Sequence, residues 1–153
     1  MSIFVGADHR GFELKNRLVG SGVLEAYDDV VDLGADVLEP LDDYNDVAVE
    51  AAKRVLEHVD EEMRAILICG SAQGEMMQTN RFKGIRAVNP RNPEETMVCK
   101  EYHDANVLCL GNRMVGTLMA ENIVDAFLHT DFGGERHQRR VDQITELDET
   151  RGE

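Results

Sequence analysis

Long hydrophobic runs are missing from this sequence of 153 residues. No stretch reaches the roughly 18 consecutive apolar residues that a transmembrane helix requires, which argues against a membrane span. The N-terminal segment MSIFVGADHR has too short an apolar run for a signal peptide, and a charged side chain arrives at Asp8. We therefore expect a soluble protein that stays where it is made.

Basic residues are scarce: 16 Lys and Arg stand against 30 Asp and Glu, and the formal net charge is −14. Such a surface repels nucleic-acid phosphates and anionic lipids, which argues against nucleic acid or a membrane as partner. A small-molecule ligand is the better expectation. Acidity of this kind serves solubility and also occurs in proteins from salt-rich habitats, so the composition leaves the habitat open.

Cysteine patterns typical of disulfide frameworks and metal sites are also absent. Cys69, Cys99 and Cys109 form no CxxC motif, and their odd number argues against a disulfide-stapled fold. Histidines, cysteines and carboxylates do not cluster at metal-ligand spacing, so the sequence predicts no metal site. A reducing cytoplasm is the expected location.

Short apolar segments alternate with helical patterns along the chain. Apolar residues recur every fourth position from Val47 to Val59 and from Met119 to Phe127, as they do in amphipathic helices. Segments typical of strands, short and rich in branched residues, are 2–7, 30–35, 65–70, 84–88 and 106–111. The alternation predicts a single α/β domain with a five-stranded parallel sheet that helices cover on both faces.

Ligands of such sheets bind at the carboxyl ends of the strands, so the segments after the strands are the candidate site. Asp8 and His9 follow the first strand and precede a predicted helix. Backbone N–H groups, a helix dipole and an imidazole could converge there on an anion. The same residues also suit a helix N-cap beside a surface histidine, and both interpretations stay open.

The third strand ends in a glycine-containing loop, residues 70–74, that leads into a predicted helix. Its N–H groups suit an oxyanion or a phosphate, although it is neither a Walker A loop nor a dinucleotide-binding GxGxxG motif. Cys69 before the loop and Glu75 after it could each supply a base. Alternatively, Cys69 is a buried hydrophobe and Glu75 a surface carboxylate favoured by the helix dipole.

Arginines gather near the C-terminus of this acidic chain, at Arg136, Arg139 and Arg140. Arg136 and Arg140 are four residues apart, so on a helix they would share a face and could bind one dianion with their forked donors. The alternative is a solvated basic face that balances nearby carboxylates.

Six segments, in this order, resemble the type B ribose-5-phosphate isomerase family, which includes the galactose-6-phosphate isomerase subunits: GADHRGFELK, DDYNDVA, ICGSAQGE, NRFKGIRAV, DANVLCLGNRMVG and GGERHQRRVDQIT. The resemblance spans nearly the whole chain and implies a Rossmann-like three-layer α/β/α sandwich, with residues 1–153 as one sugar-phosphate isomerase domain. It also implies a homodimer, or a tetramer, with interfacial active sites, a C-terminal helix packed on the partner, and no metal or organic cofactor. The implied reaction converts an aldose phosphate into a ketose phosphate.

The resemblance also implies roles for individual residues. Asp8 and His9 match a pair used in ring opening and substrate binding. The anion-stabilising turn corresponds to Ser71 with Gly70 and Gly74. The remaining matches are a substrate-contacting tyrosine and the phosphate-binding arginines, some of which reach in from the partner subunit: Tyr44, Arg113, Arg136 and Arg140.

Members of this family use one of two bases, a cysteine at position 69 or a glutamate at position 75, and this chain carries both. A thiol with a pKa near 8.5 needs positive surroundings to become a thiolate, whereas a glutamate with a pKa of about 4.3 ionises without help. An ionised Glu75 would also oppose a second negative charge on Cys69. The sequence therefore favours Glu75 as the base.

One motif departs from the family pattern. Tyr102-His103 stands where most members have His-Asn, so a tyrosine replaces the histidine of ring opening and His103 replaces an anion-stabilising asparagine. Tyrosine is a poor acid–base group at neutral pH. A tetrose 4-phosphate never closes a furanose ring, so its isomerisation would not need the histidine that is replaced. Alternatively, His103 or Asp8 takes over ring opening and the substrate is ribose 5-phosphate.

Two other interpretations remain. The substrate could be a hexose 6-phosphate, or the chain could be a flavodoxin-like module that binds a phosphorylated ligand without turnover. Such a module would share the alternating elements, the glycine-containing loop and the arginine pair, but it would not need Ser71 with a candidate base on each side.

Overall fold

Helices and strands alternate along the chain, as the sequence predicts. The computed structural model describes residues 1–34, 36–57 and 62–150. The elements are β1 (Ser2–Ala7), α1 (Phe12–Val19), α2 (Gly22–Glu25), β2 (Val30–Asp32), α3 (Tyr44–Glu57), β3 (Met63–Cys69), α4 (Gln73–Thr79), β4 (Ala87–Val88), α5 (Pro93–His103), β5 (Val107–Gly111), α6 (Thr117–His129) and α7 (Glu135–Thr150). Two predicted strands are shorter than expected, since segment 30–35 contributes 3 residues and segment 84–88 contributes 2. Val59, the last of the predicted helical positions, lies outside the described residues.

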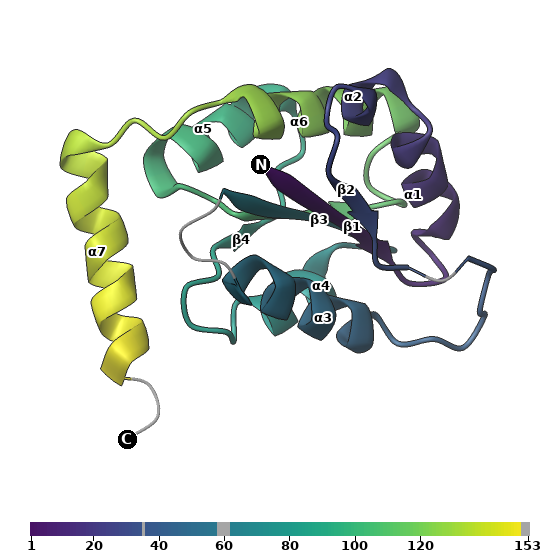
Figure 1. The fold of residues 1–153 in the computed structure, drawn as a ribbon, viewed down its shortest axis with the longest axis horizontal. Helices are drawn as coiled ribbons and strands as arrows, with labels where there is room; N and C mark the ends of the chain where they lie inside the picture. Colours follow the sequence, from purple (N-terminus) through teal and green to yellow (C-terminus); the bar gives the residue numbers. More distant parts are fainter. Residues whose placement is uncertain (35, 58–61, 151–153) are drawn as a thin grey trace.

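All five strands run parallel, in the order β2-β1-β3-β5-β4. Helices α1, α2, α5 and α6 cover one face of the sheet, and α3 and α4 cover the other (Figure 1). The predicted α/β class and the five-stranded parallel sheet between helical layers are confirmed.

Strand β3 shows why this arrangement can be read from the sequence. Ile66 and Ile68 pack into the core beneath α1 and α6, whereas Ala65 and Leu67 pack into the core beneath α3 and α4. Successive side chains point to opposite faces of a strand, so a central strand with helices on both faces is apolar at almost every position. All seven residues of β3 are buried, which gives segment 65–70 its unbroken apolar run.

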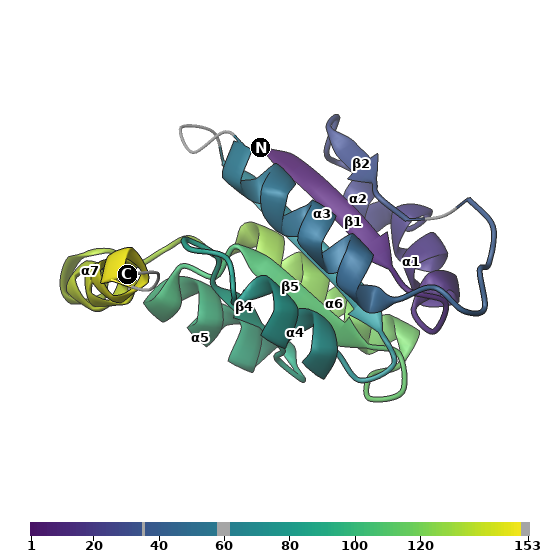
Figure 2. The ribbon, with the colours of Figure 1, turned by 90° about the horizontal axis from the view of Figure 1, so that it is seen from below.

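The C-terminal helix α7 stands apart from this body. It lies beyond the β4 edge of the sheet and packs on α5 (Figures 1 and 2). Tyr102 of α5 stacks on His137 of α7, with ring centroids 4.4 Å apart and planes inclined by 5°. Ile144 and Leu147 of α7 are 43% and 62% exposed. Helix α7 therefore leaves part of its apolar side uncovered within the single chain.

Candidate active site

A cavity of about 370 Å³ opens at the carboxyl edge of the sheet, where β1 and β3 end side by side. The chain leaves β1 for α1 on one face of the sheet and leaves β3 for α4 on the other. Because these connections diverge, a crevice forms between them, and sheets of this kind bind ligands in such crevices. The residues that line the cavity are Asp8, His9, Arg10, Asp42, Asp43, Tyr44, Cys69, Gly70, Ser71, Gly74 and Arg113.

Most of the site residues predicted from the sequence meet at this cavity. Those in its lining are Asp8, His9, Tyr44, Cys69, Gly70, Ser71, Gly74 and Arg113. Glu75 is wholly buried next to the lining. The predicted residues on α5 and α7 lie outside the lining: Tyr102, His103, Arg136 and Arg140. One chain therefore assembles the strand-end and loop residues but not those of α5 and α7.

Three residues of the lining were missed by the sequence analysis: Arg10, Asp42 and Asp43. All three belong to the motifs GADHRG and DDYNDVA, so a signal was present. Local patterns do not reveal that the loop before α3 folds back to the end of β1, because that contact joins segments far apart in the chain.

The Asp8 side chain closes the turn between β1 and α1. Its Oδ1 accepts hydrogen bonds from the backbone N–H groups of Arg10 and Gly11, at 2.9 and 3.0 Å. The side chain is buried, with 5% of its surface exposed. The N-cap of α1 is Gly11, so the interpretation of Asp8 as the helix N-cap is wrong, and the Asp8 side chain instead holds the turn that precedes α1. The Asp8 carboxylate also occupies two N–H donors that could otherwise have bound an anion.

His9 is held by Asp42 and is not an unattached surface histidine. Asp42 Oδ1 lies 2.8 Å from His9 Nδ1 and also accepts the backbone N–H of His9 at 2.8 Å. A carboxylate oxygen can only accept, so Nδ1 carries the proton in this pair and Nε2 stays available to another partner. Asp42 therefore sets both the position and the tautomer of the imidazole.

The loop after β3 turns sharply at Ala72, whose φ of 69° is in the left-handed region. This conformation is unfavourable for a residue with a Cβ, by roughly 1–2 kcal/mol. The turn directs the Ala72 N–H to Cys69 Sγ, 3.1 Å away. Ser71, at the tip of the loop, is exposed and lines the cavity. The loop thus combines a thiol with a backbone donor and a hydroxyl.

Cys69 and Glu75 flank this loop and perturb each other. Burial raises the pKa of the Cys69 thiol to about 11, and the charge of Glu75 adds to the rise, whereas the N–H groups of Ser71 and Ala72 oppose it. Glu75 has none of its surface exposed. Burial raises the pKa of Glu75 well above its usual range; the Cys69 thiol opposes this rise and Asp8 adds to it. The alternative of Glu75 as a surface carboxylate is therefore wrong.

Tyr44, the first residue of α3, packs its ring directly on Gly74. A Cβ added to Gly74 would lie 2.4 Å from Tyr44 Cζ, which is closer than any tolerated contact. The ring can lie against the loop only because position 74 has no side chain. Gly74 thereby keeps the phenol in the cavity wall.

The charge of the lining is unfavourable for a phosphorylated ligand within a single chain. Three carboxylates, Asp8, Asp42 and Asp43, face two guanidinium groups, Arg10 and Arg113. A dianion would meet net repulsion there unless further positive charge is brought in.

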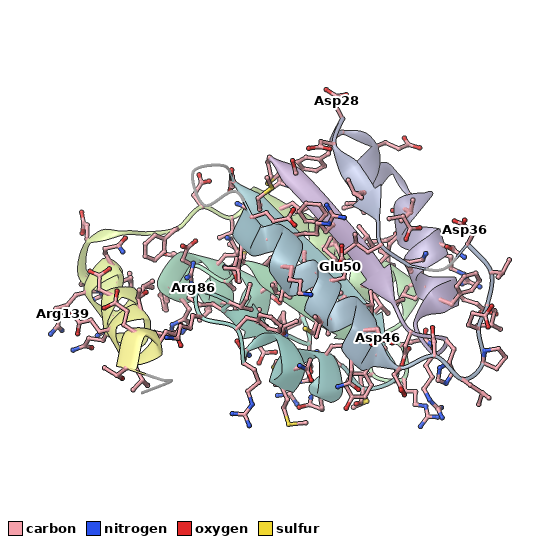
Figure 3. The ribbon with its side chains drawn as sticks, turned by 60° about the horizontal axis from the view of Figure 1, so that its bottom comes forward. Asp28, Asp36, Asp46, Glu50, Arg86 and Arg139 are labelled. Atoms are coloured by element: carbon pink, nitrogen blue, oxygen red, sulfur yellow. The ribbon has the colours of Figure 1, made fainter. Side chains whose placement is uncertain are left out.

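The predicted arginine pair is on α7, away from this cavity. Arg136 and Arg140 are both exposed and four residues apart on one helix, as expected. Figure 3 shows neighbouring Arg139 at the left end of the molecule, whereas Asp46, near the start of α3, lies right of its centre. Within one chain, these arginines therefore cannot supply the positive charge that the cavity lacks.

Among residues 1–34, 36–57 and 62–150, no three His, Cys, Asp or Glu side chains come together where they could hold a metal ion. Across the same ranges, no helix has the length and apolarity needed to cross a membrane.

The comparison with known proteins agrees with this arrangement. Residues 3–144 match the protein-family model described as Ribose/Galactose Isomerase. The chain belongs to this family. The resemblance inferred from the six sequence motifs is therefore confirmed.

Individual members of the ribose/galactose isomerase family match over almost their full length. Ribose-5-phosphate isomerase B of Escherichia coli is 39% identical over 150 residues, which cover 97% of both chains. The probable ribose-5-phosphate isomerase B of Mycoplasma genitalium is 37% identical over 143 residues, 94% of this chain and 93% of the relative. The crystal structure of the Mycoplasma genitalium enzyme with bound ribulose-5-phosphate has a TM-score of 0.91 to this chain, at 36% identity and 97% coverage of each.

Proposed function

We propose that this protein is an aldose–ketose isomerase that interconverts ribose 5-phosphate and ribulose 5-phosphate through an enediolate. The observation that carries the proposal is the cavity in which Cys69, Ser71 and the N–H groups of their loop adjoin Asp8 and His9. Its support is the family of the chain and the ribulose-5-phosphate bound to the Mycoplasma genitalium relative.

The reaction needs a base and an oxyanion site close together. The base removes the C2 proton of the aldose, an enediolate forms, and the proton returns at C1. We assign the base to the Cys69 and Glu75 end of the cavity, and the stabilisation of the oxyanion to Ser71 and the loop of residues 70–74. Proton transfers alone complete this reaction, so the proposal includes neither a metal nor an organic cofactor.

Ring opening is assigned to the residues at the end of β1. Asp8 and His9 both line the cavity, and His9 is oriented by Asp42 with Nε2 available. Tyr102 is engaged in its stack on His137, and neither it nor His103 lines the cavity of its own chain. Asp8 and His9 can therefore serve a cyclic pentose phosphate even though the family's histidine is replaced at position 102.

The charge of the cavity and the position of α7 support a homodimer. We propose that α7 packs on a second copy and carries Arg136 and Arg140 to the partner's cavity, where they bind the phosphate together with Arg113. The net negative lining of one cavity and the uncovered apolar side of α7 support this arrangement. Residues 1–153 would then act as one domain whose active site is completed by a second copy.

The location proposed for the reaction is a reducing cytoplasm. Cys69, Cys99 and Cys109 are all free, and the proposed chemistry needs Cys69 reduced. Cytoplasmic enzymes keep their thiols in this state.

A substrate panel tests the function. The kcat/KM for ribose 5-phosphate is expected to exceed that for erythrose 4-phosphate or a hexose 6-phosphate by at least about tenfold, or about 1.4 kcal/mol of transition-state discrimination. A tenfold preference for the tetrose would instead show that Tyr102-His103 has redirected the site to substrates without a ring. If no sugar phosphate of the panel is converted to a ketose, the protein is a binding module and not an isomerase.

Replacing Gly74 with alanine is expected to raise KM for the sugar phosphate about tenfold, because the added methyl displaces the Tyr44 ring that lines the cavity. The melting temperature should change little, since the Tyr44 ring is partly exposed and can move aside. Gly22→Ala is the matched control, because a Cβ there meets no heavy atom within 4 Å. An unchanged KM for Gly74→Ala would show that Tyr44 does not contribute to substrate binding.

A further inference from the structure

Arg10 lies in the wall of the active-site cavity, in the turn between β1 and α1. Its backbone N–H donates to Asp8 Oδ1 at 2.9 Å, which fixes the main chain at this position. The side chain is exposed, so the guanidinium group faces the cavity without being removed from water. The roles proposed for Asp8 and His9 make no use of this positive charge.

Arg10 and Arg113 lie against the same glycine of the loop after β3. A Cβ built on Gly70 would be 3.0 Å from Arg10 Cδ, 3.8 Å from Arg10 Cβ and 3.9 Å from Arg113 Nε. Since these distances start from one point, the two side chains lie close together on the same side of Gly70. The Arg113 N–H also donates to the Gly70 carbonyl at 3.1 Å. Because position 70 has no side chain, the cavity wall has room for two arginines.

Both guanidinium groups are unengaged in the part of the chain that the structure describes. Within residues 1–34, 36–57 and 62–150, neither has a side-chain hydrogen bond or an ion pair, although carboxylates line the same cavity. The Asp8 carboxylate accepts backbone N–H groups, and that of Asp42 holds His9. The donors of Arg10 and Arg113 are therefore available to a ligand. By contrast, the arginines that pair with carboxylates elsewhere are Arg54, Arg64, Arg86 and Arg91.

The stability of α1 does not account for an arginine at position 10. Arg10 immediately precedes Gly11, the N-cap of this helix. The N-terminus of a helix carries a partial positive charge, so a cation there is unfavourable. A carboxylate is favourable at the same place, and Glu13 provides one in the first turn. The position of Arg10 thus favours a role in ligand binding over a role in folding.

We propose that Arg10 is a further phosphate-binding residue, and that Arg10 and Arg113 form the part of the phosphate site that each chain supplies to its own cavity. This inference rests on the proposed isomerase function and adds a residue to its substrate site. Adjacent guanidinium groups donate forked, charge-assisted hydrogen bonds that match the oxygens of a phosphate dianion. Their charges offset part of the negative charge of the lining, and Arg136 and Arg140 of the partner subunit supply the rest.

Binding of inorganic phosphate tests this assignment without turnover. In the full-length protein, Arg10→Met is expected to raise the Kd of inorganic phosphate at least about fivefold, because methionine keeps an apolar stem but has no forked donors. Isothermal titration calorimetry measures it. Arg17→Met is the matched control, since it removes an exposed arginine of α1 outside the cavity and changes the net charge equally. Equal effects of the two variants, or no binding of phosphate to the wild-type protein, overturn the proposal.

The kinetics with ribose 5-phosphate separate phosphate binding from a structural role. Arg10→Met should raise KM at least about fivefold and leave kcat within about twofold, because the phosphate is bound alike in the ground and transition states. The melting temperature should not fall, since the cation removed is next to a helix N-terminus. A lower kcat at unchanged KM, or a lower melting temperature at unchanged phosphate affinity, overturns the proposal. If phosphate affinity depends on Arg10 but no sugar phosphate is isomerised, the proposed function fails and this phosphate site stands.

Discussion

Replacing Cys69 with serine is expected to lower kcat for ribose 5-phosphate by a factor of about 10² to 10⁴, with little change in KM. Serine has nearly the shape of cysteine and can still accept the Ala72 N–H that now meets Sγ at 3.1 Å. Its hydroxyl does not become an effective anionic base at neutral pH. The loss should therefore fall on proton transfer and not on binding. Initial rates of ketose formation measure it.

The double variant Cys69→Ser/Glu75→Gln sharpens this prediction. Groups that act as one unit are not additive, so the double variant should be no slower than the slower single variant. Cys99→Ser, on α5 and outside the cavity lining, is the control for a thiol that takes no part. If Cys69→Ser keeps more than about a third of the wild-type kcat, the base lies elsewhere.

Mixing two inactive proteins should restore activity if α7 completes the partner's cavity. One protein carries Cys69→Ser, and the other carries Arg136→Ala with Arg140→Ala. In their heterodimer, one cavity combines an intact Cys69 with intact arginines from the partner. Random reassociation should recover about a quarter of the wild-type activity, because about half of the dimers are mixed and one of their two sites is intact.

The control for this complementation is a mixture of Cys69→Ser with Glu75→Gln. Both of these side chains lie at the cavity of their own chain, so every cavity in their heterodimer is damaged and no activity should return. If the mixture of Cys69→Ser with the Arg136→Ala/Arg140→Ala variant is no more active than the mean of the two separate proteins, Arg136 and Arg140 do not act across an interface. They would then be the solvated basic face that the sequence left as an alternative.

The sequence by itself determined the fold class and the family. Segments 2–7 and 65–70 are recognisable as strands because burial on both faces requires apolar residues throughout, and this requirement is local. The alternation of such segments with helical patterns was enough to predict the parallel sheet and hence the edge at which ligands bind. The order of the six motifs identified the family, because it depends on residue identity and spacing alone.

The environments of individual side chains were decided only by the tertiary structure. Glu75 has the sequence context of a surface carboxylate at the start of a helix, yet it is wholly buried, because α4 directs that side chain toward Cys69 and Cys109. The pairing of His9 with Asp42 depends on a loop that returns to the end of β1, and the two residues are 33 positions apart in the sequence.

The separation of α7 from the cavity is the clearest case of this kind. Arg136 and Arg140 carry the same local pattern whether their helix covers its own cavity or points away from it. Figure 2 shows α7 beyond the edge of the sheet, a position set by its packing on α5. Protonation states and the distances between charges follow from which segments meet in space. Local patterns therefore supplied the candidate residues, and the packing of distant segments decided which of them meet within one chain.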